Sequence, residues 1–114
     1  MTTGSAPDAI VDAVATFFND HEVASLKLPS GWFGRPHDNM HQLSEVSTDG
    51  QRVRICLDQT QDLDLDASGF SVDGRTLRVV IGAGSWDWTD YGGSERHHES
   101  LDRGEVEFHA PYHQ

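Results

Sequence analysis

Residues 51–81 read QRVRICLDQTQDLDLDASGFSVDGRTLRVVI, and apolar side chains alternate with polar ones through most of this stretch. Alternation with a period of two is typical of a β-strand that turns one face to the core and the other to water. The apolar residues that share a face form three sets: Val53, Ile55 and Leu57; Leu63 and Leu65; and Leu77, Val79 and Ile81. The stretch therefore predicts several half-buried strands of one sheet.

Two Asp-Gly pairs separate the strand-like runs. Asp49-Gly50 lies between HQLSEVST and QRVRICLD, and Asp73-Gly74 lies between GFSV and RTLRVVI. Asp-Gly between two strands favours a two-residue hairpin turn, because both central positions need positive φ. The pairs therefore predict antiparallel hairpins.

The flanking segments extend this pattern less regularly. Leu43 and Val46 have opposite parity, and a bulge near Ser44 would restore the register of the first hairpin. SWDWTDY at 85–91 and EVEFHAP at 105–111 read as two further strands, and GGSERHHESLDRG between them reads as a polar loop.

A helix is predicted over residues 5–20. Ser5 fits the N-cap and Asp8 the third helical position of a capping pattern. One apolar stripe with a period of 3.6 follows, made up of Ile10, Val11, Val14, Phe17 and Phe18. The sequence as a whole predicts an α+β fold, in which one N-terminal helix packs on a curled antiparallel sheet of six to eight short strands. Residues 1–114 are expected to form a single domain.

The charge narrows the class of partner. The chain has 19 acidic and 8 basic residues and a net charge of −11. Phosphate contacts need clustered Lys and Arg, so the charge disfavours nucleic acid and anionic membrane surfaces. The net negative charge favours solubility, or it provides an acidic surface that docks on a basic protein.

A cytoplasmic location is expected. The start MTTGSAPDA has neither the basic segment nor the apolar segment of a signal peptide, and no apolar run approaches the length of a membrane span. Cys56 is the only cysteine, so no disulfide can form within the chain.

Residues 28–41 read LPSGWFGRPHDNMH and cannot form regular structure throughout, because prolines and glycines interrupt them. Trp32 and Phe33 are too apolar to lie in water, and they are expected to anchor a compact loop against the sheet or helix. Four polar residues would then be held on a rigid support, namely Arg35, His37, Asp38 and His41.

The string LPSGWFGRPHDN resembles a stretch, LPxGWFGRPxDN, of small bacterial proteins that have no assigned activity. The resemblance covers about fifteen residues. It implies that the loop is characteristic of a family, and it implies no activity, cofactor or partner.

A second aromatic cluster contains Trp86, Trp88 and Tyr91. It suits core packing or an aromatic platform for a sugar, a peptide or a flat small molecule. We expect one ligand-binding surface formed by Arg35, His37, Asp38, His41, Trp88 and Tyr91. If Asp38 neutralises Arg35, a neutral polar molecule or a peptide is the better ligand.

Other site chemistries have weaker support. His37 and His41, and likewise His109 and His113, are four residues apart, but prolines keep both pairs off a helix, so no metal site is predicted.

The run Asp62, Asp64 and Asp66 starts like a calcium loop, yet the leucines between its acids fit a strand better. No nucleophile signature surrounds Cys56, and no phosphate-binding or dinucleotide motif is present, so no cofactor is expected.

Three functional classes remain. The first is a non-catalytic domain that binds a ligand or peptide near residues 28–41. The second is an acidic inhibitor or immunity-type protein that caps a basic partner. Its contacts would be Asp62, Asp64, Asp66, Glu105 and Glu107. The third is a small enzyme that uses His37 or His41 with Asp38 as an acid–base pair.

Overall fold

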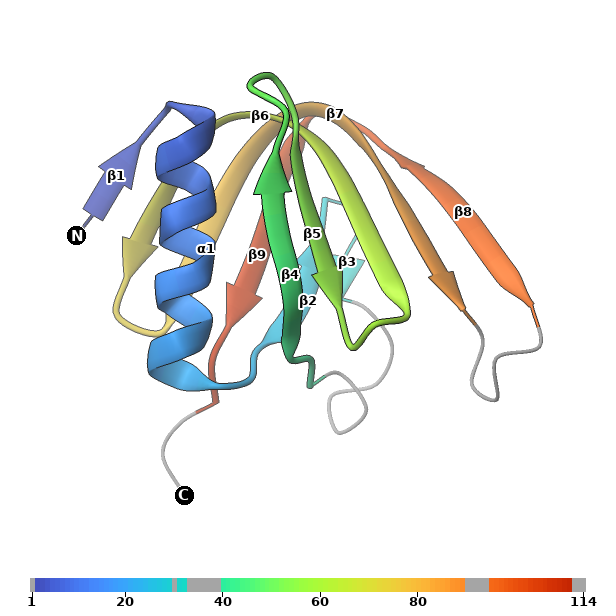
Figure 1. The fold of residues 1–114 in the computed structure, drawn as a ribbon, viewed down its shortest axis with the longest axis horizontal. Coiled ribbons are helices and arrows are strands. Elements are labelled where there is room, and N and C mark those ends of the chain that lie inside the picture. Colours follow the sequence, from blue (N-terminus) through green and yellow to red (C-terminus); the bar gives the residue numbers. More distant parts are fainter. Residues whose placement is uncertain (1, 30, 33–39, 90–94, 112–114) are drawn as a thin grey trace.

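The computed structural model of the protein describes residues 2–29, 31–32, 40–89 and 95–111. These residues form one α-helix and nine strands, which Figure 1 shows. In chain order the elements are β1 (Thr2–Gly4), α1 (Pro7–His21), β2 (Ser25–Leu28), β3 (Gly31–Trp32), β4 (Leu43–Thr48), β5 (Val53–Leu57), β6 (Gln61–Asp73), β7 (Thr76–Thr89), β8 (Arg96–Leu101) and β9 (Gly104–His109). The predicted α+β class, one helix on an antiparallel sheet, is confirmed.

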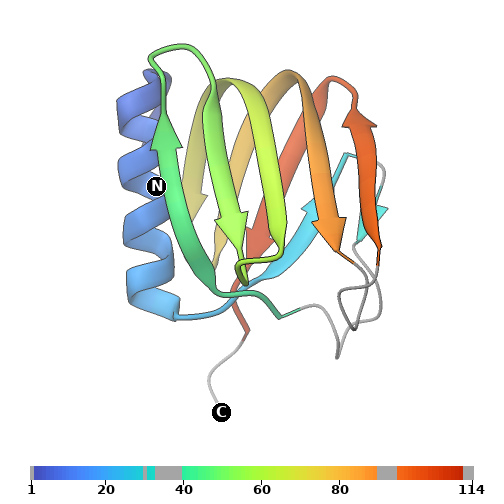
Figure 2. The ribbon, with the colours of Figure 1, turned by 45° about the vertical axis from the view of Figure 1, so that its right-hand side comes forward.

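All the strands belong to one antiparallel sheet in the order β3-β2-β9-β7-β6-β5-β4, with β1 beside β6 and β8 beside β7. The sheet curls, and α1 lies along one side of it (Figure 2). The sequence suggested shorter strands, but β6 and β7 run for 13 and 14 residues. Residues 76–81 of β7 pair with β9, and residues 84–89 pair with β8. The long hairpin thereby links two parts of the sheet.

Gly84 lies where β7 changes partners. A Cβ atom there would stand 2.9 Å from the carbonyl oxygen of Asp64 on β6, closer than real side chains approach. The register of β6 shifts nearby, on both sides of Ala67. Glycine between the two predicted strands thus allows one strand to bend, where the sequence suggested a break.

Helix α1 places its apolar stripe on the inner face of the sheet. Ile10, Val14, Phe17 and Phe18 are buried, and Phe18 meets Phe108 of β9 edge to face at 5.4 Å between ring centroids. The predicted start of the helix is wrong, because the N-cap is Ala6 and no side chain caps the first turn. Pro7 occupies the first helical position, which its fixed φ suits, and this excludes Ser5 as N-cap.

Both predicted hairpins form. The second has a turn of the predicted two-residue length, placed one residue later than the Asp-Gly pair, whereas the first turn is longer than predicted. Thr48 pairs with Val53, so the first turn contains residues 49–52. Asp73 pairs with Thr76, so the second turn consists of Gly74 and Arg75. The predicted bulge is confirmed, since the register shifts between Leu43 and Glu45.

The predicted polar loop at 92–104 is wrong in its central part, because residues 96–101 form β8. Among the described residues β8 pairs with β7 alone, which leaves most of its side chains exposed and makes its sequence resemble a loop. His97 lies opposite Trp88 and Leu101 is buried. Within the described residues, no helix has the length and apolar character needed to cross a membrane.

Candidate functional site

The turn between β5 and β6 organises one end of the sheet. Asp58 and Gln59 have φ angles of 55° and 60°, in the left-handed region that residues other than glycine rarely adopt. The N–H of Gln59 donates to Ser44 Oγ at 2.8 Å, and that of Thr60 donates to the Leu57 carbonyl at 3.0 Å. Contacts from β4 and β5 therefore support the strained turn.

Strands β7 and β8 attach to the same turn. The carbonyl of Thr60 accepts a hydrogen bond from the N–H of Thr89 at 3.2 Å and another from Arg96 Nη1 at 3.1 Å. Arg96 also pairs with Asp62 at 2.5 Å. We call this region the loop end of the sheet: the 58–60 turn, residues 41–44, the start of β6 and β8, and the end of β7 (Figure 1, lower part).

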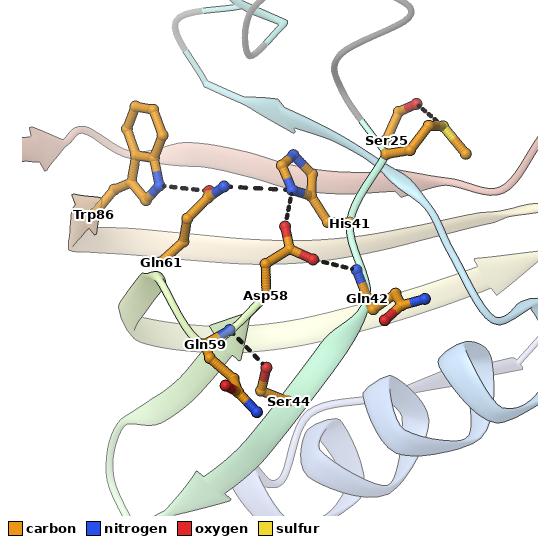
Figure 3. Close-up of polar contacts among 9 residues, drawn as sticks. Ser25, His41, Gln42, Ser44, Asp58, Gln59, Gln61 and Trp86 are labelled. Carbon is orange, nitrogen blue, oxygen red and sulfur yellow. Dashed lines mark hydrogen bonds and ion pairs between the residues drawn. The ribbon is translucent and has the colours of Figure 1, made fainter. Parts of the chain in front are cut away.

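His41 and Asp58 form the centre of the loop end (Figure 3). Asp58 Oδ2 lies 2.7 Å from His41 Nδ1, and Oδ1 accepts the backbone N–H of Gln42 at 2.9 Å. The backbone of His41 exchanges two hydrogen bonds with Ala24, at 2.9 and 3.0 Å. The pair therefore joins the segment before β2, the segment before β4 and the β5–β6 turn at one point.

The hydrogen bonds assign the tautomer of His41. The indole N–H of Trp86 donates to Gln61 Oε1 at 3.3 Å, so the amide nitrogen of Gln61 faces His41, 3.3 Å from Nδ1. Nδ1 cannot accept from Gln61 and donate to Asp58 at once. The shorter contact, to a carboxylate, is the stronger one. We therefore place the hydrogen on Nδ1, where it is donated to Asp58.

Acid–base enzymes use this kind of histidine–carboxylate pair to present Nε2 for proton transfer. In this structure the His41 side chain is 3% exposed, and that of Gln61 is 7% exposed. A substrate atom would need direct access to the ring, and this burial denies it. The geometry fits a structural role for the pair, which fixes the loop end.

An aromatic stack lies beside this network. Trp86 and Trp88 stack at 5.3 Å between centroids with planes 19° apart, and His97 stacks on Trp88 at 4.3 Å and 20°. Trp86 is buried, Trp88 is partly buried, and the side chain of His97 is 36% exposed. The stack therefore runs from the core outward, and its outer ring is accessible to a ligand.

Two of the six predicted site residues lie in the described part of the chain, and Gln61 connects them. It contacts His41 through its side chain and is the cross-strand partner of Trp88. The other four, Arg35, His37, Asp38 and Tyr91, lie outside the described residues, as do Phe33 and the side chain of Trp32.

The sequence prediction missed three residues of the loop end: Asp58, Gln61 and His97. Asp58 lies in a turn without glycine or proline, Gln61 is a polar residue at the start of β6, and His97 lies in a segment that resembles a loop. His97 belongs to a strand that pairs with an aromatic strand. Knowledge of that pairing would have identified His97, but the pairing cannot be read from the sequence.

The outer face of the sheet carries acidic residues. A polar hollow of about 300 Å³ is lined by Glu45, Asp62, Asp64, Asp87 and Arg54, among others. Several of these carboxylates are already paired, Asp64 with Arg52 at 2.7 Å and Asp87 with His98 at 2.5 Å. Arg52 on Asp64 and Arg96 on Asp62 therefore balance part of the local acidic charge.

Cys56 also borders this hollow. Burial, and then the neighbouring Asp62 carboxylate, raise the pKa of its thiol. The thiol therefore stays protonated at neutral pH, which is unsuited to nucleophilic attack.

Within the described residues, no three His, Cys, Asp or Glu side chains are grouped so as to hold a metal ion. Asp62, Asp64 and Asp66 occupy alternate positions of strand β6, as the strand interpretation predicted. His109 Nε2 lies 2.7 Å from Glu107 Oε1, and His113 is outside the described residues.

No family model, no curated protein and no solved structure matches this chain.

Proposed function

We propose that the protein is a small binding domain that recognises a peptide or a neutral polar molecule at the loop end of its sheet, next to residues 28–41. The observation that carries the proposal is the aromatic stack. Its outer ring, His97, is partly exposed, and its inner ring, Trp86, donates a hydrogen bond to Gln61, whose side chain contacts His41. Exposed rings on a fixed support give contact area at a low cost in conformational entropy.

The polar groups favour an uncharged ligand. Asp58 is matched by His41 and by the Gln42 N–H, and Arg96 by Asp62. A charged ligand would have to displace these partners, whereas a neutral one can use hydrogen bonds and stacking. Arg96 and the 58–60 turn also tie the ends of four strands together, which is the rigidity that a preformed site requires.

Docking of a basic protein on the outer face of the sheet is the second candidate. The polar hollow on that face favours it, because four carboxylates and one arginine surround the hollow. Pairing of Asp64 with Arg52 and of Asp62 with Arg96 reduces the negative charge available to a partner. This candidate requires binding that weakens steeply with added salt.

Amide NMR spectra during addition of a library of short peptides and neutral sugars would test the proposal. The expected shifts map to residues 58–61, Trp88 and β8. His97→Ala is expected to weaken the best ligand several-fold, since a ring stacking partner is worth about 0.5–1.5 kcal/mol.

His98→Ala is the matched control, because His98 is the next residue on β8 and contacts Asp87 on the other face. Equal weakening by both variants, or the lack of any binder with shifts at the loop end, would contradict the proposal. Binding that disappears at high salt and is insensitive to His97→Ala would favour the acidic face.

A further inference from the structure

A second cavity lies between α1 and the β1–β6 side of the sheet. It has a volume of about 500 Å³ and is open to solvent. The β6–β7 hairpin tip lies beside the lower half of α1 in Figure 1, away from β8. We call this cavity the helix groove. It shares no lining residue with the loop end.

The helix groove has an apolar floor. Phe17 and Phe70, which are 2% and 7% exposed, underlie the floor, and the partly buried Val72 lines it with them. Ala9 and Ala13 line the helix side one turn apart, and their short side chains leave the space between α1 and β6 unfilled. An occupant would therefore meet hydrocarbon and aromatic carbon along the floor.

The rim of the groove is acidic. Asp12 and Asp20 lie on the same side of α1 with Thr16 between them, and all three line the groove. Eight residues of α-helix separate the two aspartates by about 12 Å along the axis. The described residues that line the groove include no Lys or Arg, and His21, whose ring rests on Phe17 at 4.7 Å, is the one basic side chain.

We propose that the helix groove binds a linear aliphatic diamine or polyamine. The alkyl chain covers the floor at Phe17 and Phe70, and one ammonium group lies near each of Asp12 and Asp20. Charge complementarity selects this ligand over anions and fatty acids, because the lining in the described part of the chain contains two carboxylates and no lysine or arginine. The separation of the carboxylates selects a molecule with positive charge at both ends over a simple amine.

This inference is independent of the function proposed for the loop end, since the ligand, the residues and the face differ. Binding at exposed carboxylates is weak and sensitive to salt, so affinity has to be measured at low ionic strength. The chain carries a net charge of −11, and non-specific attraction of any cation is the effect to separate from site binding.

The experiment is a calorimetric and NMR titration of the intact chain with diaminooctane at low salt. Octylamine and octanediol, which keep the chain and remove one or both charges, are the comparison probes. Diaminooctane is expected to bind at least tenfold more tightly than octanediol, with shifts at Ala9, Ala13 and Phe70. Equal binding of octanediol would overturn the assignment of an ammonium ligand.

Two double variants with the same change in charge separate the site from the net charge. Asp12→Asn with Asp20→Asn is expected to weaken diaminooctane about tenfold or more. Asp66→Asn with Glu105→Gln removes two exposed carboxylates from other elements. This double variant is expected to change the affinity for diaminooctane less than about twofold. Equal weakening, or no binding to the unmodified chain, would overturn the proposal.

Ala13→Leu gives an independent check, because it fills the groove and leaves every charge in place. Loss of diaminooctane binding with an unchanged melting temperature is the expected result. Should Ala13→Leu destabilise the fold, the aspartate variants still decide the matter, since both aspartates are exposed on the helix surface.

Discussion

Two turns of the sheet both contain residues with positive φ, in the left-handed region, but the two turns are stabilised in different ways. Gly74, in the β6–β7 turn, has a φ of 62°, and Asp58 and Gln59, in the β5–β6 turn, have φ of 55° and 60°. Glycine adopts this conformation without a steric penalty, whereas other residues lose roughly 1–2 kcal/mol each. Local chemistry therefore suffices at Gly74, and the 58–60 turn depends on contacts with other strands.

Those contacts come from segments distant in sequence. His41, Gln42 and Ser44 reach the 58–60 turn from before and within β4, and Thr89 reaches it from the end of β7. The turn is strained where the aromatic stack and the buried histidine meet, and strained backbone is often found at binding sites. The comparison predicts different responses of the two turns to substitution.

The largest effect is expected for Asp58→Ala. It removes the acceptor of His41 Nδ1–H and of the Gln42 N–H, and it leaves alanine in the left-handed region. Losing hydrogen bonds to a charged group costs about 1.5–3 kcal/mol, so a loss of about 3 kcal/mol in unfolding free energy is expected. Urea denaturation at neutral pH measures it.

Asp73→Ala, beside Gly74, is the control for this substitution. Asp73 is exposed and Gly74 supplies the positive φ of the β6–β7 turn, so a loss below about 1 kcal/mol is expected. Similar losses in the two variants would mean that the 58–60 turn is not held by its distant contacts.

Smaller changes in stability are expected when glycine is removed from one turn and introduced into the other, and the two changes should have opposite signs. Gly74→Ala introduces a Cβ atom at positive φ and is expected to cost about 1 kcal/mol. Gln59→Gly relieves the same strain at an exposed position and is expected to stabilise by roughly 0.5 kcal/mol, after the added entropy of the unfolded chain. Melting temperatures that fall in both variants would show that Gln59 contributes contacts beyond its backbone.

The same contrast explains what could be predicted from the sequence. The faces of β5, β6 and β7, the apolar stripe of α1 and the bulge at Ser44 follow from local periodicity, and the structure confirms them. The continuity of β7 through residues 82–84 was not predictable, because glycine suits a break as well as a bend. The strand at 96–101 was missed because its polar sequence suits an exposed edge strand and a loop equally.

The candidate site was predictable only in part, for the same reason. His41 and Trp88 were selected for their chemistry, and the structure connects them through Gln61. Asp58, the partner of His41, lies 17 residues away in sequence. No local pattern distinguishes its carboxylate from the other aspartates, because the sheet pairing alone brings it to His41.

The smallest effect is expected at the third turn, residues 49–52, which is again local. The Asp49 carboxylate accepts the backbone N–H groups of Arg52 and Gln51, both at 2.9 Å, and these hydrogen bonds hold the pKa of Asp49 below its ordinary value. A carboxyl whose pKa is lower in the folded chain than in the unfolded chain stabilises the fold at neutral pH. That contribution is lost as the pH falls through the folded-state pKa.

Asn at position 49 keeps a side-chain oxygen that accepts both hydrogen bonds, but the Asn side chain does not titrate. Asp49→Asn is therefore expected to have nearly the parent stability at neutral pH and to lose less of it on acidification to about pH 3. Urea midpoints at the two pH values measure the difference, with Asp66→Asn as the control that removes an equal charge from β6. Parallel losses in the parent chain and in Asp49→Asn would show that the turn owes nothing to the ionised carboxylate, and the contrast between local and distant support would then rest on Gly74 and Asp58 alone.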